Sequence, residues 1–125
     1  MIRTVVIDDE NKARETIVNM LDMYCKDVDV VAEAHDVQSG YDAIRKHAPE
    51  LVLLDIKMPD GTGFDLLRKF LNFDFQVIFI TAYEEFAIRA FKFSALDYLL
   101  KPIGPDELIG AVQKAQDKLN SDNLT

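Results

Sequence analysis

The stretch Leu51-Val52-Leu53-Leu54-Asp55 is a short, unbroken apolar run that ends on a carboxylate. A strand that is apolar at every position needs cover on both faces, as in a parallel sheet with helices on either side. Two further runs have the same character: Thr4 to Ile7, which ends before Asp8, and Val77 to Ile80, which ends before Thr81. We therefore predict that these three runs are central strands of one parallel sheet.

Amphipathic helix patterns separate the strand-like runs. Two more such runs, Val28 to Ala34 and Leu96 to Leu100, bring the number of βα units to five. Strand–helix alternation with short connections predicts right-handed crossovers, and a closed eight-stranded barrel would need about twice the length. We predict an α/β fold of the flavodoxin-like type, a doubly wound five-stranded parallel sheet in the order 2-1-3-4-5 with five helices.

The helix patterns also predict which side chains face the core, because apolar residues three and four apart share one helix face. The predicted inward side chains are Phe64, Leu67 and Leu71 in the third helix, and Phe86 and Phe91 in the fourth. The last helix is predicted to start near Pro105 and to end near Leu119. Residues 1–119 then form one domain, and residues 120–125 a polar linker or frayed tail.

Composition limits the classes of partner. The 125 residues suit one domain. Because 22 acidic residues outnumber 14 basic ones, the net charge of -8 repels phosphates, and we expect no direct nucleic-acid contact by this domain. One cysteine, Cys25, allows no internal disulfide. The chain shows neither a membrane-length apolar run nor a signal-peptide start, so we expect a cytoplasmic location and no membrane partner.

Polar side chains follow four of the predicted strands. They are Asp8 and Asp9, Asp55, Thr81 and Lys101. Since the carboxyl ends of parallel strands meet at one edge of the sheet, these side chains should converge there. Three carboxylates together repel one another unless a cation joins them, and hard oxygen ligands of this kind suit Mg²⁺. With one lysine and one divalent cation the formal charge becomes zero, and the site could accept a phosphoryl group.

Each of these residues also has an ordinary structural explanation. An aspartate after a strand is often a helix N-cap, which fits Asp8 and Asp9 taken alone. Thr81 could simply end a strand, and Lys101 could be a solvated surface charge. Only their joint placement at the strand ends favours a functional acidic pocket over these explanations.

The motifs in this order resemble the receiver domain of two-component response regulators. The resemblance covers residues 2 to about 119, and it rests on Val6–Glu10, Leu53–Gly61, Ile80–Ala82 and Asp97–Pro102. The segments Thr81–Ala87, Ala90–Phe91 and Ala95–Pro102 look like the LytTR (LytR/AlgR-type) subgroup. Members of that subgroup usually carry a C-terminal DNA-binding domain, which we do not expect within these 125 residues.

The resemblance implies a role for each strand-end residue. Asp55 would accept a phosphoryl group from a sensor histidine kinase. Mg²⁺ would be held by Asp8, Asp9, Asp55 and the backbone carbonyl of Lys57. The phosphoryl oxygens would be bound by Thr81, Ala82 and Lys101. The aromatic switch would be Tyr98, whose rotamer follows Thr81, and the Lys101–Pro102 peptide bond would be cis.

Two positions would set the lifetime of the phosphoryl group, Lys57 and Tyr83, and bulky Tyr83 is predicted to slow its hydrolysis. The output would be a changed helix 4 and strand 5 face that controls homodimerisation and, in a full-length protein, transcription. The interface candidates are Arg89, Lys92 and Phe93.

Other functions stay open at this stage. A stand-alone receiver that docks on a partner protein is the most serious alternative within the family. A haloacid-dehalogenase-like phosphatase would want a second aspartate at position 57, where this chain has Lys57. A flavin binder would want a Ser/Thr/Gly-rich loop after the first strand, where this chain has acids. We therefore expect a phosphoacceptor regulatory domain that assists only its own phosphotransfer and dephosphorylation, not an enzyme.

Overall fold

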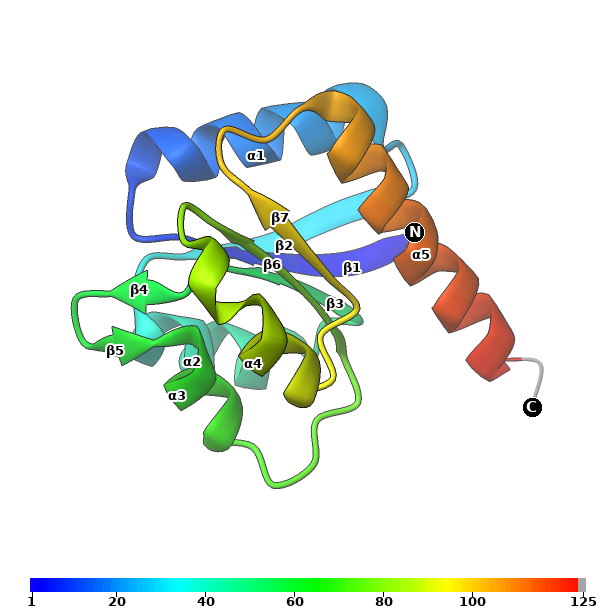
Figure 1. The fold of residues 1–125 in the computed structure, drawn as a ribbon. Helices are drawn as coiled ribbons and strands as arrows, with labels where there is room; N and C mark the ends of the chain where they lie inside the picture. Colours follow the sequence, from blue (N-terminus) through cyan, green and yellow to red (C-terminus); the bar gives the residue numbers. More distant parts are fainter. Residues whose placement is uncertain (124–125) are drawn as a thin grey trace.

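Five parallel strands form one sheet at the centre of the molecule (Figure 1). The computed structural model describes residues 1–123. The strands are β1 (Ile2–Ile7), β2 (Val28–Ala34), β3 (Leu51–Leu54), β6 (Gln76–Thr81) and β7 (Asp97–Leu100). Their order is β2-β1-β3-β6-β7. This confirms the predicted order 2-1-3-4-5 once the short hairpin of β4 (Lys57–Met58) and β5 (Gly61–Thr62) is set apart.

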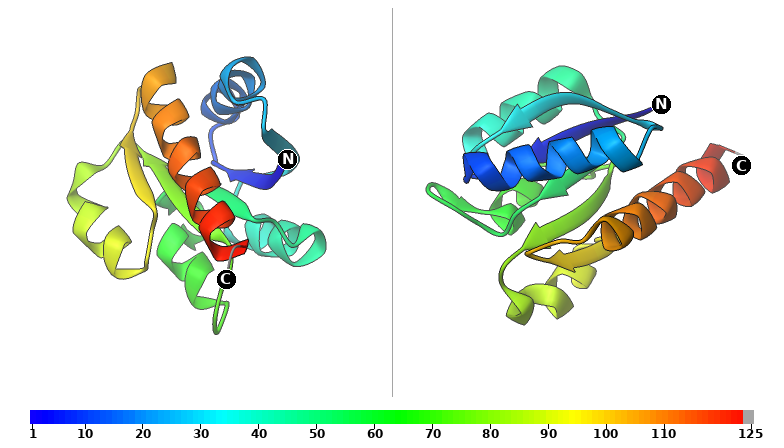
Figure 2. Two further views of the ribbon diagram at one scale, coloured as in Figure 1. Left: turned by 90° about the vertical axis from the view of Figure 1, so that its right-hand side faces the viewer. Right: turned by 90° about the horizontal axis from the view of Figure 1, so that it is seen from above.

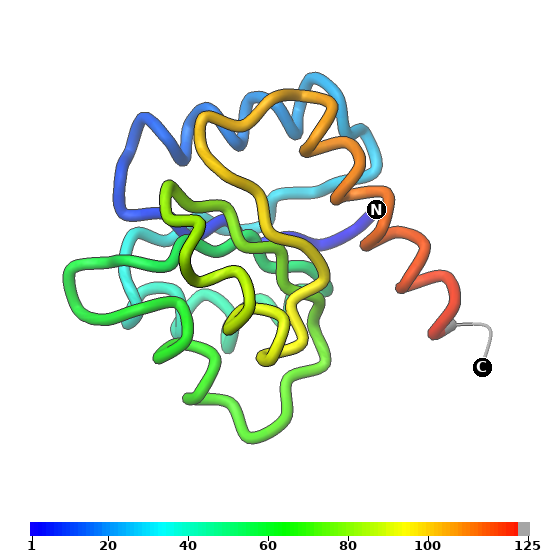
Figure 3. Tube along the Cα trace, viewed as in Figure 1, coloured from blue at the N-terminus to red at the C-terminus, as the bar shows by residue number. Residues whose placement is uncertain are grey.

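Helices cover both faces of the sheet, as Figures 1 and 2 show. One face carries α1 (Asn11–Tyr24) and α5 (Pro105–Asn123), and the other carries α2 (Val37–His47), α3 (Gly63–Arg68) and α4 (Ala87–Lys92). A single 3₁₀ turn, η1 (Glu84–Phe86), precedes α4. The side chains of the sheet divide into two apolar clusters, one under each helical layer. The winding changes direction between β1 and β3, and the tube in Figure 3 shows how the chain crosses the sheet there.

The layer of α2, α3 and α4 packs around one aromatic ring. The ring of Phe64, the second residue of α3, is fully buried. Its centroid lies 5.2 Å from that of Phe79, 5.1 Å from that of Phe93 and 6.3 Å from that of Phe86. Phe91, predicted to face the core, is instead 53% exposed. The prediction for α4 was wrong here, because α4 has only six residues and contacts the sheet through Ala90 and Phe93.

Two other helix predictions need correction. α3 ends at Arg68, so Leu71, predicted to face inward, lies in the following loop and is fully exposed. α5 continues to Asn123, where a polar tail was predicted from residue 120 onward. Polar pairs one turn apart, Gln116–Asn120 and Lys118–Asp122, suit an exposed helix of this kind. The last two residues of the predicted tail, 124 and 125, lie outside the described residues.

No helix within residues 1–123 combines the length and the apolar character that crossing a membrane requires.

Candidate functional site

The carboxyl ends of four strands bring the predicted site residues together. Asp8 follows β1, Asp55 follows β3, Thr81 ends β6 and Lys101 follows β7. The backbone continues the sheet pairing into this edge: the Asp55 amide donates to the Ile7 carbonyl at 3.0 Å, and the Lys101 amide donates to the Thr81 carbonyl at 2.9 Å. The convergence predicted from parallel strands is therefore present in the structure.

Lys101 links the two buried acids of the site. Its Nζ lies 2.7 Å from Oδ2 of Asp8 and 2.9 Å from Oδ2 of Asp55. Burial lowers the pKa of Lys101, but its hydrogen bonds to Asp8 and Asp55 outweigh that effect and raise the pKa above its usual value. Burial in turn raises the pKa of Asp8, whose side chain is fully enclosed. The single ammonium group of Lys101 therefore interacts with two carboxylates at once.

The acidic cluster has the composition of a magnesium site. One carboxylate oxygen from each of Asp8, Asp9 and Asp55 lies within 4.8 Å of the others. Asp8 and Asp55 are buried whereas Asp9 is exposed, so the cluster is open to solvent on one side. Carboxylates that leave room for water suit Mg²⁺, which retains several waters when bound by proteins. The donor set therefore fits this cation.

Thr81 supplies a second observation at the same edge. Its side chain is fully buried, yet its Oγ1 has no hydrogen-bond partner among the described residues. A buried hydroxyl without a partner is costly, and such groups are uncommon in native proteins. An oxygen-bearing ligand bound between Thr81 and Lys101 would accept a hydrogen bond from this hydroxyl. Ala82, the next residue, is small and exposed.

The segment after Asp55 folds as a tight hairpin. β4 (Lys57–Met58) pairs with β5 (Gly61–Thr62) in antiparallel register. The Gly63 amide closes the hairpin by donating to the Ile56 carbonyl at 2.7 Å. The hairpin thus fixes the position of Lys57, whose carbonyl is the expected fourth metal ligand.

Aromatic side chains flank the site on the α4 side. The Nζ of Lys57 lies 4.1 Å from the ring centroid of Tyr83, within cation–π range. The hydroxyl of Tyr98 donates to the backbone carbonyl of Tyr83. The two positions expected to control phosphoryl lifetime are therefore in contact with each other, and the expected switch residue is bonded to one of them. The Lys101–Pro102 peptide bond is cis.

Sequence reasoning missed two residues that shape the site. Arg14 on α1 donates to the Asp8 carbonyl at 2.7 Å and pairs with Glu33 at 3.1 Å, which anchors the loop after β1. Gly63 lies so close under the loop that a Cβ there would be 2.5 Å from the Asp55 carbonyl oxygen. The sequence carries no local signal for this glycine, because the close approach joins two separate segments of the backbone.

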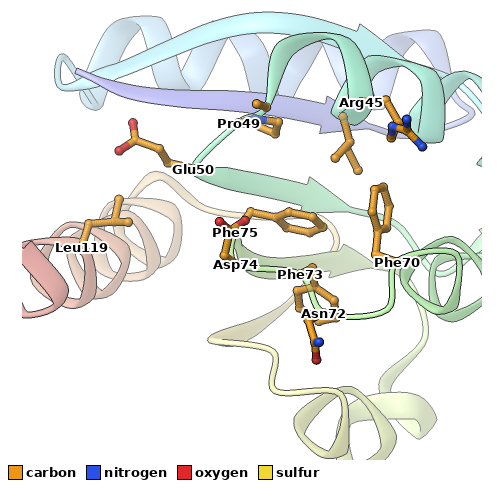
Figure 4. Close-up of a pocket in the computed structure, with 11 residues that line it drawn as sticks. Arg45, Pro49, Glu50, Phe70, Asn72, Phe73, Asp74, Phe75 and Leu119 are labelled. Atoms are coloured by element: carbon orange, nitrogen blue, oxygen red, sulfur yellow. The ribbon is translucent and has the colours of Figure 1, made fainter.

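A cavity of about 370 Å³ lies at the opposite ends of the strands. Figure 4 shows Pro49 and Glu50 at the start of β3, with Phe70, Phe73 and Phe75 from the segment before β6. Parallel α/β sheets bind ligands at the carboxyl ends of their strands, not at these starts. This cavity is therefore separate from the acidic site.

Comparison with known proteins identifies the family. Residues 4–113 match the model of the response regulator receiver domain, and the chain belongs to that family. Sensory transduction protein LytT of Bacillus anthracis is 33% identical over 124 residues, which cover 97% of this chain and 50% of that protein. An uncharacterized response regulatory protein of Vibrio vulnificus is 40% identical over 116 residues, covering 91% of this chain and 47% of that protein. The chain spans about half the length of the curated relatives it matches.

Solved structures give the same assignment. The receiver domain of AraT, a response regulator from Geobacillus stearothermophilus, matches with a TM-score of 0.88 at 31% identity and covers 98% of both chains. The receiver domain of the response regulator NarL from Mycobacterium tuberculosis matches with a TM-score of 0.81 at 31% identity, covering 92% of this chain and 96% of that one. The predicted family is confirmed, and the similarity to LytT agrees with the predicted LytTR subgroup.

The close approach of Gly63 to the Asp55 carbonyl predicts that a larger residue at position 63 destabilises the fold. Gly63→Ala should lower the free energy of unfolding by about 1–3 kcal/mol, because the added methyl group overlaps the Asp55 carbonyl. Gly110→Ala is the matched control: no atom lies within 4 Å of a Cβ there, and alanine should stabilise α5 by about 0.5–1 kcal/mol. Urea denaturation measures both. Equal effects of the two substitutions would contradict the steric argument.

Proposed function

We propose that this receiver domain is a phosphorylation-dependent switch whose acceptor is Asp55. A carboxylate oxygen of Asp55 attacks the phosphorus of a phosphohistidine on a sensor kinase. The new O–P bond forms as the P–N bond breaks, and the imidazole leaves with the electron pair and takes up a proton. The product is an acyl phosphate on Asp55, and water later hydrolyses it.

The observation that carries this proposal is the unpartnered hydroxyl of Thr81 beside the Lys101–Asp55 ion pair. A phosphoryl group on Asp55 brings three acceptor oxygens and about -1.5 to -2 charges. Thr81 would donate its hydroxyl to one oxygen, the Ala82 amide would donate to a second, and Lys101 would offer its ammonium. The phosphoryl oxygens would add negative charge and acceptors to the unmodified site, so these contacts would favour the phosphorylated form.

Magnesium is the cofactor that we propose for the same site. Asp8, Asp9 and Asp55 would hold it together with the Lys57 carbonyl, and the bound ion would neutralise charge on the phosphoryl oxygens. The three carboxylates and the waters that they leave room for support this choice of metal. Lys101 bridges two of these carboxylates, those of Asp8 and Asp55.

The proposed output face lies on α4 and β7. Two apolar side chains three residues apart on α4, Ile88 and Phe91, are 76% and 53% exposed. Leu100 at the end of β7 is also exposed. Of the interface candidates predicted from the sequence, Arg89 and Lys92 are exposed, whereas Phe93 packs against Phe64. We therefore place Ile88 and Phe91 at the centre of a homodimer interface that forms on phosphorylation.

The switch would connect the two regions through Tyr98. Its hydroxyl is bonded to the Tyr83 carbonyl, and its ring lies 6.1 Å from that of Phe79. Movement of Thr81 toward the phosphoryl group would open space beside β6, and Tyr98 would turn inward to fill it. In a longer protein, a dimer formed in this way would control transcription through a separate DNA-binding domain. A stand-alone receiver that docks on another protein is the alternative.

The choice of acceptor can be tested with a small-molecule phosphodonor. Incubation with acetyl phosphate and Mg²⁺ should add one phosphoryl group to the parent chain, as measured by intact mass, and none to Asp55→Asn. Asp42→Asn, which alters an exposed carboxylate on α2, should be labelled like the parent. Chelation of Mg²⁺ should stop the labelling. Labelling of Asp55→Asn at the parental rate would refute the proposal.

The dimer face can be tested with BeF₃⁻ and Mg²⁺ in place of the phosphoryl group. Light scattering should show a monomer that becomes a dimer when both are added. Ile88→Ser and Phe91→Ser should each weaken that dimer about tenfold or more, because each removes an apolar side chain worth about 1.5–3 kcal/mol when buried. Leu71→Ser is the control, since Leu71 is as exposed but lies on the α3–β6 segment. Equal weakening by all three variants would count against this face.

The lifetime of the phosphoryl group can be tested at Tyr83. Its ring stacks against the Lys57 ammonium beside the site, so its loss should admit water. Tyr83→Ala should therefore lose the phosphoryl group several-fold faster than the parent in a single-turnover decay measured by mass. Tyr83→Phe retains the ring and should decay at nearly the parental rate. Unchanged decay in Tyr83→Ala would disprove the shielding role.

A further inference from the structure

Asp60 makes a contact that the phosphorylation site does not explain. It lies at the turn of the β4–β5 hairpin, and its carboxylate reaches α2 instead of the metal cluster. Oδ1 accepts the amide of Val37 at 2.8 Å, and Oδ2 accepts the amide of Gln38 at 3.0 Å. Both oxygens of one side chain are therefore bonded to the first two residues of a helix that begins more than twenty residues earlier in the chain.

The N-terminus of α2 already carries a complete local cap. Asp36 accepts the amide of Ser39 at 2.7 Å, and the Ser39 hydroxyl in turn accepts the amide of Asp36. This capping box leaves the first two amides of the helix without a partner from their own segment, and Asp60 supplies it. A carboxylate is also favoured at a helix N-terminus by the helix dipole. The bonds of Asp60 are thus a link between two elements, added to a helix that has its own cap.

The backbone next to Asp60 is built for the same close approach. Gly61 has φ +149°, a backbone conformation that residues with a side chain rarely adopt. A Cβ there would be 3.4 Å from Val37 and 3.0 Å from an oxygen of Asp65. The hairpin is closed at its other end by the pairing of Lys57 with Thr62. The segment that carries Lys57 is therefore held at its base by β5 and at its turn by α2.

We propose that Asp60 is a positioning residue for the metal site: its two bonds to α2 hold the hairpin so that the Lys57 carbonyl faces the carboxylates of Asp8, Asp9 and Asp55. This inference rests on the proposed function, because it assigns a consequence to the same magnesium site. Without Asp60, the hairpin keeps its β4–β5 pairing but loses its two side-chain bonds to α2. The Lys57 carbonyl then spends less time in the orientation that metal binding needs.

The competing explanation is that Asp60 only stabilises α2. Asp36 provides the matched control, because Asp36→Ala removes a carboxylate cap from the same helix end and leaves the bonds of Asp60 in place. A purely structural role predicts similar behaviour of the two variants in every measurement. A positioning role predicts that both lose stability and that only the Asp60 variant loses metal affinity.

The experiment measures Mg²⁺ binding to the purified chain by isothermal titration calorimetry, without any phosphodonor. Asp60→Ala should weaken Mg²⁺ binding about tenfold, the lower end of the effect of removing partners that orient metal ligands. The Mg²⁺ affinity of Asp36→Ala should stay within about twofold of that of the parent. Loss of this cap costs about 1 kcal/mol of stability, which leaves the folded state dominant. Amide exchange should show faster exchange of Val37 and Gln38 in Asp60→Ala.

Each result has one interpretation. Parental affinity in Asp60→Ala with fast exchange at Val37 and Gln38 overturns the positioning role. Equal weakening in both variants also overturns it, in favour of a structural role. If the parent itself fails to bind Mg²⁺, the proposed function fails instead. Asp60→Asn, which keeps one acceptor oxygen, serves where Asp60→Ala does not fold: intermediate affinity supports the role, and parental affinity contradicts it.

Discussion

The site depends on a single ammonium group that pairs with two buried carboxylates at the edge of the sheet. Each buried ion costs several kcal/mol of desolvation, which neighbouring charges and hydrogen bonds must offset. Lys101 does this for Asp8 and Asp55 at once, at 2.7 and 2.9 Å. Three acids and one lysine still leave a formal charge of -2, which one divalent cation would balance. The strand ends place the carboxylates together, and their charge favours a cation between them.

Under the proposed function, phosphorylation of Asp55 would change the surface formed by α4 and β7. Shifting a two-state equilibrium from 1:99 to 99:1 needs about 5.5 kcal/mol of differential interaction. One hydrogen bond to a charged group supplies about 1.5–3 kcal/mol, so the Thr81 hydroxyl alone is insufficient. Under the proposed function, the Thr81 hydroxyl and the Ala82 amide together would supply about 3–6 kcal/mol, a range that includes the required amount. A site with several donors around one acceptor is therefore a requirement of the energetics, not a redundancy.

The sequence predicted the sheet and the convergence of the strand-end residues, because both follow from the apolar runs and from where these runs end. Runs such as Leu51–Leu54 are apolar at every position, which only a doubly covered strand explains, and parallel strands place their last residues at one edge. The helical layer was predicted less well. Leu71 lies beyond the end of α3, and Phe91 lies on the exposed side of α4, yet both continue an apolar spacing, so periodicity alone assigned them to the core.

The residues that support the site could not be predicted, because their contacts join distant segments. Arg14 reaches the Asp8 carbonyl from α1, and Asp60 reaches α2 from a turn 23 residues further along the chain. No local pattern distinguishes such an aspartate from an ordinary turn residue. Gly63 is similar: its lack of a side chain matters only because the Asp55 carbonyl passes directly over it.

These supporting contacts suggest how the site and the output face share one layer. The hairpin after Asp55 touches α2 through Asp60 and the α4 side through the contact of Lys57 with Tyr83. Tyr83 in turn holds the hydroxyl of Tyr98. A rearrangement at Asp55 therefore meets packed side chains on both sides of the hairpin. Since packed cores change between discrete arrangements and do not deform continuously, the proposed switch requires a shift of one loop at this edge to reach α4 as a change of state.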